Sequence, residues 1–145
     1  MNFVFILCDD LGYGDMGCFG GRAIDTPHLD RLADEGLRFT DHYSGSPVCA
    51  PARGVLMQGL HTGHCRVRHN RTADERPAAI KVGDTTLTRL LHEAGYRGGV
   101  FGKWGIGDLG TDGVPWNHGV DELSASSARS PPTTTTPARS CTTTA

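Results

Sequence analysis

The sequence predicts an α/β fold with a mainly parallel sheet, and three short segments support this. Residues 3–8 (FVFILC) form a continuous apolar run rich in branched and aromatic side chains, which is typical of a buried parallel strand. Residues 37–43 alternate apolar and polar side chains, and residues 96–101 (YRGGVF) form a third short run. Helical patterns separate these segments, and strands that alternate with helices favour a parallel sheet.

Three helices are expected from apolar periodicity and from residues that begin or end helices. The first spans residues 26–35 and stops at Gly36. The second begins at Pro51, because proline suits a first helical turn, where its missing N–H would have no partner. The third spans residues 86–94, with a threonine as N-cap and Gly95 as its stop. The apolar face expected for the second helix consists of Val55, Leu56 and Leu60.

Two polar segments lie outside this pattern. Residues 67–83 are expected to form a surface loop. From residue 124 to residue 145 the chain is rich in Ser, Thr and Pro, which predicts a disordered tail after a folded region of residues 1–123. The tail is either a natural flexible end or out-of-frame sequence joined to a truncated gene, and the abrupt change in composition favours the second origin.

Composition excludes several classes of partner. The formal net charge is −2 and no basic stripe is present, so nucleic acid is not an expected partner. No apolar run is long enough for a membrane span, and no signal-peptide pattern follows Met1. The five cysteines are scattered without a CxxC pair, which argues against a disulfide framework or a zinc site. The chain as given is therefore expected to be cytoplasmic, away from membranes.

Asp9 and Asp10 stand directly after the first predicted strand. Ligands of open α/β sheets bind beyond the carboxyl ends of the strands. Two adjacent carboxylates offer hard oxygen donors that suit Ca²⁺ or Mg²⁺. The alternative is that the pair simply ends the strand in a turn, and the residues alone leave both interpretations open.

Cys49 lies just before the helix expected from Pro51, in the stretch SPVCAPAR. Backbone N–H groups and the dipole at a helix N-terminus favour an anion and activate a thiol. Arg53 follows one turn later, where its guanidinium can reach an oxyanion or a charged nucleophile. A lone cysteine is ordinarily a small buried apolar residue, but the CxPxR context favours a nucleophile at this position.

Four stretches resemble the motifs of the sulfatase family, in the same order along the chain. They are residues 3–15, with the two aspartates and LGYGD; residues 26–44; residues 49–64, with CxPxR; and residues 93–108, with GKWGIGD. Together they cover about residues 2–122. CxPxR alone is moderately specific, whereas the ordered set is strongly so.

The resemblance implies an alkaline-phosphatase-like three-layer α/β sandwich, incomplete in this chain, with residues 1–123 as the N-terminal portion of the catalytic domain. It implies that a formylglycine-generating enzyme converts Cys49 to formylglycine, whose hydrated aldehyde attacks a sulfate monoester. Asp9, Asp10 and the modified Cys49 would bind a divalent cation, usually Ca²⁺, with Mg²⁺ as the alternative. Arg53 would steady the formylglycine, and Lys103 would contact the sulfate.

The chain departs from the family pattern at three points. Ala52 replaces the usual serine between proline and arginine, and Gly105 stands where many members have histidine. Exposed His64 and His69 are weighed as substitutes for that histidine, although loop residues are the simpler interpretation. The chain is also several times shorter than sulfatases, so downstream ligands cannot be assigned. Two alternatives therefore stay open: an inactive sulfatase fragment, and a phosphate or phosphonate ester hydrolase of the same superfamily.

Overall fold

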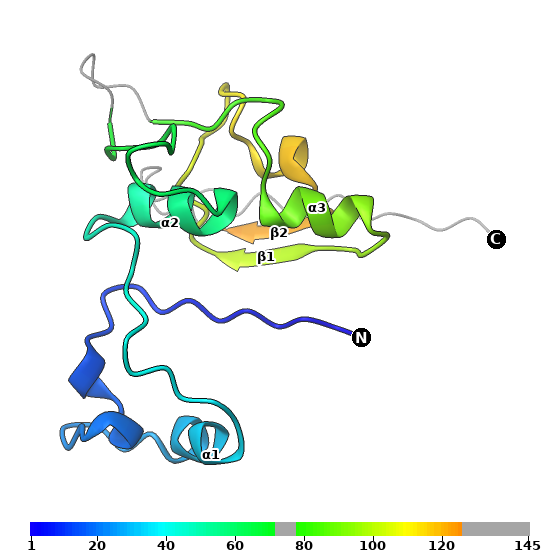
Figure 1. Cartoon of the computed structure of the whole chain (residues 1–145). Helices are drawn as coiled ribbons and strands as arrows, with labels where there is room; N and C mark the ends of the chain where they lie inside the picture. Colours follow the sequence, from blue (N-terminus) through cyan, green and yellow to red (C-terminus); the bar gives the residue numbers. More distant parts are fainter. Residues whose placement is uncertain (72–77, 126–145) are drawn as a thin grey trace. The chain divides into compact units, whose positions relative to one another are not determined.

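The computed structural model describes residues 1–71 and 78–125, which form two compact units, the first from Met1 to Tyr43 and the second beginning at Ser44. Figure 1 shows the helices and strands of both units. None of the helices in the described ranges is long and apolar enough to cross a bilayer. In chain order the elements are η1 (Tyr13–Asp15), η2 (Gly17–Phe19), α1 (Pro27–Glu35), α2 (Cys49–Gln58), α3 (Leu87–Glu93), β1 (Gly99–Gly102), η3 (Pro115–His118) and β2 (Glu122–Ala125).

In the first unit, α1 holds the glycine-rich loop that precedes it. The loop amide of Cys18 donates to Asp30 Oδ1 at 2.7 Å, and the amide of Gly17 donates to Thr26 Oγ1 at 2.9 Å. The Thr26 hydroxyl in turn donates to the same Asp30 oxygen at 3.0 Å. A Cβ on Gly17 would lie 2.4 Å from Asp30 Oδ2, so a larger residue here would displace the Asp30 carboxylate that holds the loop. The predicted helix over residues 26–35 is confirmed.

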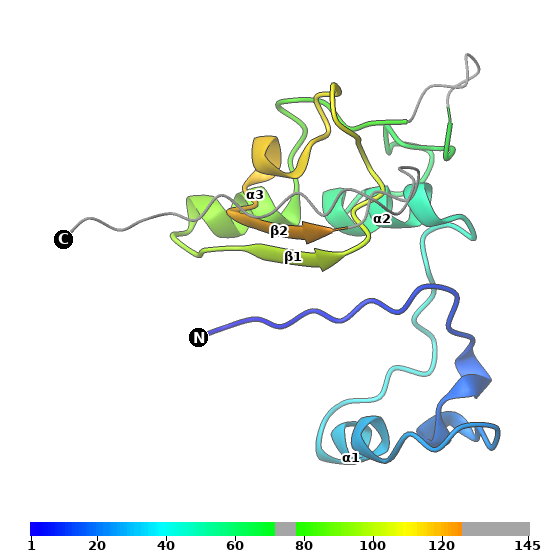
Figure 2. The same cartoon turned by 180° about the vertical axis from the view of Figure 1, so that it is seen from behind.

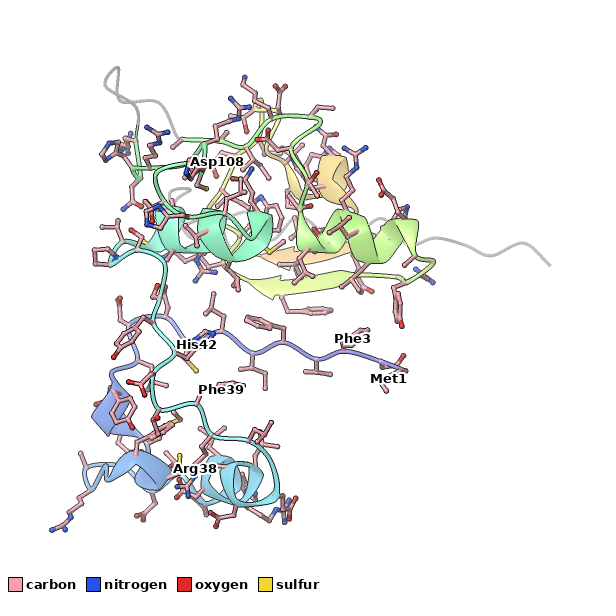
Figure 3. The ribbon with its side chains drawn as sticks, viewed as in Figure 1. Met1, Phe3, Arg38, Phe39, His42 and Asp108 are labelled. Carbon is pink, nitrogen blue, oxygen red and sulfur yellow. The ribbon has the colours of Figure 1, made fainter. Side chains whose placement is uncertain are left out.

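The strands predicted for residues 3–8 and 37–43 are wrong, because both segments are irregular in this structure. The apolar side chains of residues 3–7 are between 48% and 87% exposed. Figure 3 shows Phe3 on the first segment and Phe39 on the second. A strand forms only when another segment pairs with its backbone, and no described segment is hydrogen-bonded to these two as a strand. An apolar run indicates a propensity for a strand, but a strand also needs a second segment to pair with it.

The sheet of the second unit consists of β1 and β2, which pair in parallel. Gly99 lies opposite Glu122 and Gly102 lies opposite Ala125. The strand predicted over residues 96–101 therefore begins three residues later than expected, while β2 was not predicted because its sequence, ELSA, is short and half polar. β2 also extends across the predicted boundary at residue 123, and most of the predicted tail lies outside the described residues. Figures 1 and 2 both show α2 and α3 running along this strand pair.

The core of the second unit is small and draws on segments distant in sequence. Val67 and Ile80 are completely buried in it, so the prediction of a wholly surface loop over residues 67–83 is wrong. Gly54 on α2 is also buried, and a Cβ there would lie 3.0 Å from Cys65 Sγ. The full core cluster is Ala50, Val67, Ile80, Trp104, Ile106 and Val120.

Helix α2 packs through small residues rather than through its large ones. Its buried residues are Ala50, Pro51 and Gly54, in place of the expected Val55, Leu56 and Leu60. Small side chains allow a close approach of the helix backbone to its neighbours. The face that is most apolar in sequence is therefore not the face that the second unit buries.

Helix α3 is confirmed, with its N-cap at Thr86. The Thr86 hydroxyl oxygen accepts from the Arg89 amide at 3.2 Å. The hydroxyls of Thr86 and Thr88 both donate to the main-chain carbonyl of His118, at 3.3 and 2.7 Å, so they join α3 to η3.

An ion pair between Arg66 and Asp84 is expected to stabilise the second unit by about 1 kcal/mol. Arg66 Nε and Nη2 donate to the Asp84 carboxylate at 2.8 and 3.0 Å. The hydrogen bond from Arg66 lowers the pKa of Asp84 most, the Lys81 amide adds to this, and partial burial opposes it. Because the folded pKa lies below the unfolded one, this stabilisation is present above about pH 4 and is lost as pH falls further.

Denaturant unfolding of the wild type and Asp84→Asn checks this expectation. The difference in unfolding free energy should be present at pH 7 and should shrink in acid. Glu93→Gln is the control, because it removes the exposed i,i+4 pair with Arg89, worth only about 0.3–0.5 kcal/mol. An Asp84→Asn difference independent of pH would contradict the prediction.

Candidate active site

Cys49 is the first residue of α2, and the first turn of this helix defines the site. Its N-cap residue, Val48, has no side chain that can cap the helix. The predicted helix start at Pro51 is therefore two residues late. Cys49 is half-buried, with its thiol at the N-terminal mouth of the helix.

The backbone donors of this first turn are largely occupied. The Ala50 amide donates to Asn70 Oδ1 at 3.1 Å, and the Ala52 amide donates to the Val48 carbonyl at 2.9 Å. Pro51 has no amide hydrogen. The expectation that free helix N–H groups hold an anion therefore needs correction, since few of them remain available, although the helix dipole still favours negative charge.

Lys103 directly follows β1, at the carboxyl end of that strand, and it acts on the thiol of Cys49. Partial burial is the largest single influence and raises the pKa of the Cys49 thiol. The hydrogen bond and the positive charge of Lys103 oppose it, assisted by the Cys49 amide and by Asn70, and the pKa is lowered overall. The sequence-predicted residues Cys49 and Lys103 are thus brought together across 54 positions of chain.

Arg53 links α2 to the same segment after β1. Its Nη1 donates to the main-chain carbonyl of Lys103 at 2.5 Å. This contact fixes the backbone that carries Lys103 relative to the helix that carries Cys49. The direct role of Arg53 toward the side chain at position 49 stays a prediction.

Gly105 stands two residues after Lys103, where the family resemblance leads one to expect a histidine. Its φ is +75°, a left-handed backbone conformation that is energetically unfavourable for residues with a Cβ. A Cβ at this position would lie 3.1 Å from Arg53 Cδ and 3.6 Å from Arg53 Nε. The aliphatic stem of Arg53 therefore packs against the space that a larger residue at position 105 would fill.

Introducing the histidine expected from the family resemblance should destabilise this chain. Gly105→His should lower the free energy of unfolding by at least about 1–2 kcal/mol, the cost of the left-handed backbone, and should displace Arg53. Gly105→Ala isolates the effect of the Cβ. Gly110→Ala is the matched control, because Gly110 has a φ of +83° and open space around it. Denaturant unfolding that finds Gly105→Ala no more destabilising than Gly110→Ala would contradict the packing argument.

Asp9 and Asp10 belong to the first unit, so the structure describes them separately from Cys49, Arg53 and Lys103. Asp10 is exposed and adopts a φ of +59°, a left-handed conformation that aspartate tolerates better than most residues. The two carboxylates fit a hard cation by donor chemistry. Residues 1–71 and 78–125 contain no group of three or more His, Cys, Asp or Glu side chains that could hold a metal. The cation site therefore stays a prediction.

The structure adds one residue that the sequence gave no reason to choose. Asn70 lies in the segment predicted as a polar surface loop, 21 positions after Cys49, and no motif marks it. The histidines considered as substitutes are exposed, and the ring of His64 lies 6.4 Å from that of His61. Only the folding of residues 65–70 against α2 reveals Asn70 as part of the site.

Comparison with known proteins relates these features to a family. The Sulfatase family model matches residues 1–143. Mouse steryl-sulfatase is 36% identical over 133 residues, which is 84% of this chain and 21% of the relative. Human N-acetylgalactosamine-6-sulfatase is 37% identical over 128 residues, which is 83% of this chain and 24% of the relative. The chain thus spans less than a quarter of the length of these curated relatives.

Solved structures give the same relationship. The crystal structure of Ps i-CgsB matches with a TM-score of 0.73 and 34% identity, over 81% of this chain and 26% of that one. The same protein in complex with k-i-k-neocarrahexaose matches with a TM-score of 0.73 and 33% identity, over the same shares. The expected alkaline-phosphatase-like α/β fold is confirmed, and the described residues of this chain contain a small parallel sheet of that fold. The chain belongs to the sulfatase family.

Proposed function

We propose that this chain supplies the nucleophile-bearing part of a sulfuric ester hydrolase that cleaves sulfate monoesters. The observation that carries the proposal is the cluster of Cys49, Lys103 and Arg53. The side chain and positive charge of Lys103 lower the pKa of the Cys49 thiol, and the main-chain carbonyl of Lys103 accepts from Arg53. All three lie in motifs shared with the sulfatase family.

Each residue of the cluster would have a separate role in the reaction. Formylglycine made from Cys49 would supply a hydrated aldehyde as the nucleophile. Lys103 would neutralise negative charge on the sulfate oxygens as it builds in the transition state. Arg53 would keep the Lys103 backbone and the helix in register, so that nucleophile and ammonium group face the same oxygen atoms.

A divalent cation completes the proposal. By the family resemblance, Asp9 and Asp10 would hold Ca²⁺, or Mg²⁺ in its place. When bound, such a cation polarises the sulfate oxygens. The partners implied are a sulfate ester substrate and a formylglycine-generating enzyme that acts on the CAPAR stretch.

The test is co-expression of the full chain with a formylglycine-generating enzyme, followed by two measurements. Mass spectrometry of the peptide that contains Cys49 should show replacement of the thiol side chain by an aldehyde. The Ca²⁺-loaded protein should then hydrolyse an aryl sulfate faster than the matching aryl phosphate. Preference for the phosphate would indicate the superfamily alternative. Full conversion without turnover of either ester would overturn the proposed activity of this chain and favour the inactive-fragment alternative.

A further inference from the structure

Asn70 contacts the first turn of α2 at two atoms through one side-chain oxygen. The Ala50 amide donates to Asn70 Oδ1 at 3.1 Å. The thiol of Cys49 donates to the same oxygen, with Sγ at 3.8 Å. A backbone amide can only donate, so the atom that faces it is the oxygen of the Asn70 side chain and not its nitrogen.

Asn70 is itself held in place. Its main-chain carbonyl accepts from the Ala78 amide at 3.4 Å. Val67, three residues earlier, is completely buried in the core beside α2. The backbone at Asn70 is therefore held by this hydrogen bond and by the nearby buried Val67, and the side-chain oxygen lies at the first turn of α2.

This acceptor replaces a cap that the helix lacks. Val48 cannot cap α2 with its side chain, and Pro51 offers no amide hydrogen. The Ala50 amide is therefore an end donor of the helix that needs an outside partner, and Asn70 provides it from 20 residues away. A cap from a distant segment ties the start of the helix to that segment.

We propose that Asn70 is a positioning residue for the nucleophile. Its oxygen fixes the first turn of α2 through Ala50 and limits the rotation of the side chain at position 49, which keeps that side chain facing Lys103. This inference rests on the proposed function for its effect on turnover, whereas its structural part concerns the unmodified cysteine and stands independently.

The first measurement uses the unconverted full chain and nuclear magnetic resonance. In Asn70→Ala the Ala50 amide should exchange with solvent markedly faster, while the Ala52 amide, bonded to Val48, keeps its protection. The Hα–Hβ couplings of Cys49 should change from those of one rotamer to an average over several. Asn70→Asp, which keeps an acceptor oxygen of the same reach, should restore both signals.

The second measurement is turnover of an aryl sulfate per converted molecule. Asn70→Ala is expected to lower kcat about 10- to 100-fold with little change in KM, because misplacement of a reacting group by about 1 Å can cost that much. Asn70→Asp should recover most of kcat and raise KM, since its added charge repels the sulfate. If Asn70→Ala merely destabilised the protein, Asn70→Asp would not restore kcat while raising KM.

The control is Asn117→Ala, an asparagine whose Nδ2 donates to the Asp112 carbonyl in another part of the second unit. It should leave the Ala50 exchange, the Cys49 couplings and kcat unchanged. Unaltered Ala50 exchange and Cys49 couplings in Asn70→Ala would overturn the inference, as would altered signals with normal kcat. A wild type without sulfatase turnover would refute the proposed function, and the exchange and coupling data alone would then decide the role of Asn70.

Discussion

Replacing Cys49 with alanine is expected to lower sulfate-ester turnover by at least about 10³-fold, because removal of a catalytic nucleophile leaves only binding and electrostatic stabilisation. The helix should persist, since its first turn is held by the main-chain atoms of Val48, Ala50 and Ala52 rather than by the thiol. The measurement is kcat on an aryl sulfate, made on chains produced together with a formylglycine-generating enzyme.

Cys18→Ala is the matched control for this substitution. Cys18 is also half-buried, but the bonds described for it involve its amide, which donates to Asp30, and its carbonyl, which accepts from Arg38. Alanine keeps both groups, so turnover should stay near the wild-type value. Equal turnover in Cys49→Ala and the wild type would remove Cys49 from the mechanism.

Replacing Ile106 with alanine is expected to destabilise the second unit by about 2–5 kcal/mol, the usual cost of truncating a fully buried aliphatic side chain. Ile106 is 0% exposed and belongs to the same cluster as Val67 and Ile80. Its carbonyl also accepts from the Ile80 amide at 3.0 Å. Since small domains are stable by only about 5–15 kcal/mol, this loss is large.

Chemical denaturation followed by tryptophan fluorescence provides the measurement, because Trp104 is buried in the same cluster. Leu109→Ala is the control: it removes a side chain of similar size that is 79% exposed, and it should change stability by no more than about 0.5 kcal/mol. Similar effects of the two substitutions would mean that Ile106 is not a core residue. Loss of Ile106 should also loosen the loop that carries Gly105, close to Arg53.

Short sequence patterns correctly predicted the features that depend only on residues close together in the chain. The helix over residues 26–35 and the helix capped by Thr86 follow from capping and breaking residues, and the structure contains both. The CxPxR stretch and the lysine after the third predicted strand were sufficient to select Cys49, Arg53 and Lys103. These residues are recognisable because their type and spacing fall within short motifs that resemble those of the family.

Predictions that required a partner elsewhere in the chain were less successful. The apolar run over residues 3–8 predicted a strand, but strand pairing is a relation between two segments and the run describes only one of them. The segment over residues 67–83 appeared polar on average, yet Val67 and Ile80 are core residues. Average polarity conceals single apolar side chains that a fold can bury.

The sequence alone therefore determined the family and the α/β class, because each depends on residue type and order within short stretches. It also selected Cys49 as the predicted nucleophile. Tertiary structure decided how the site is assembled: Arg53 bonds to the backbone of Lys103, and Asn70 caps the helix that begins at Cys49. These contacts join residues between 20 and 50 positions apart. Hydrogen bonds over such separations depend on how the chain packs, which no local pattern of residues encodes.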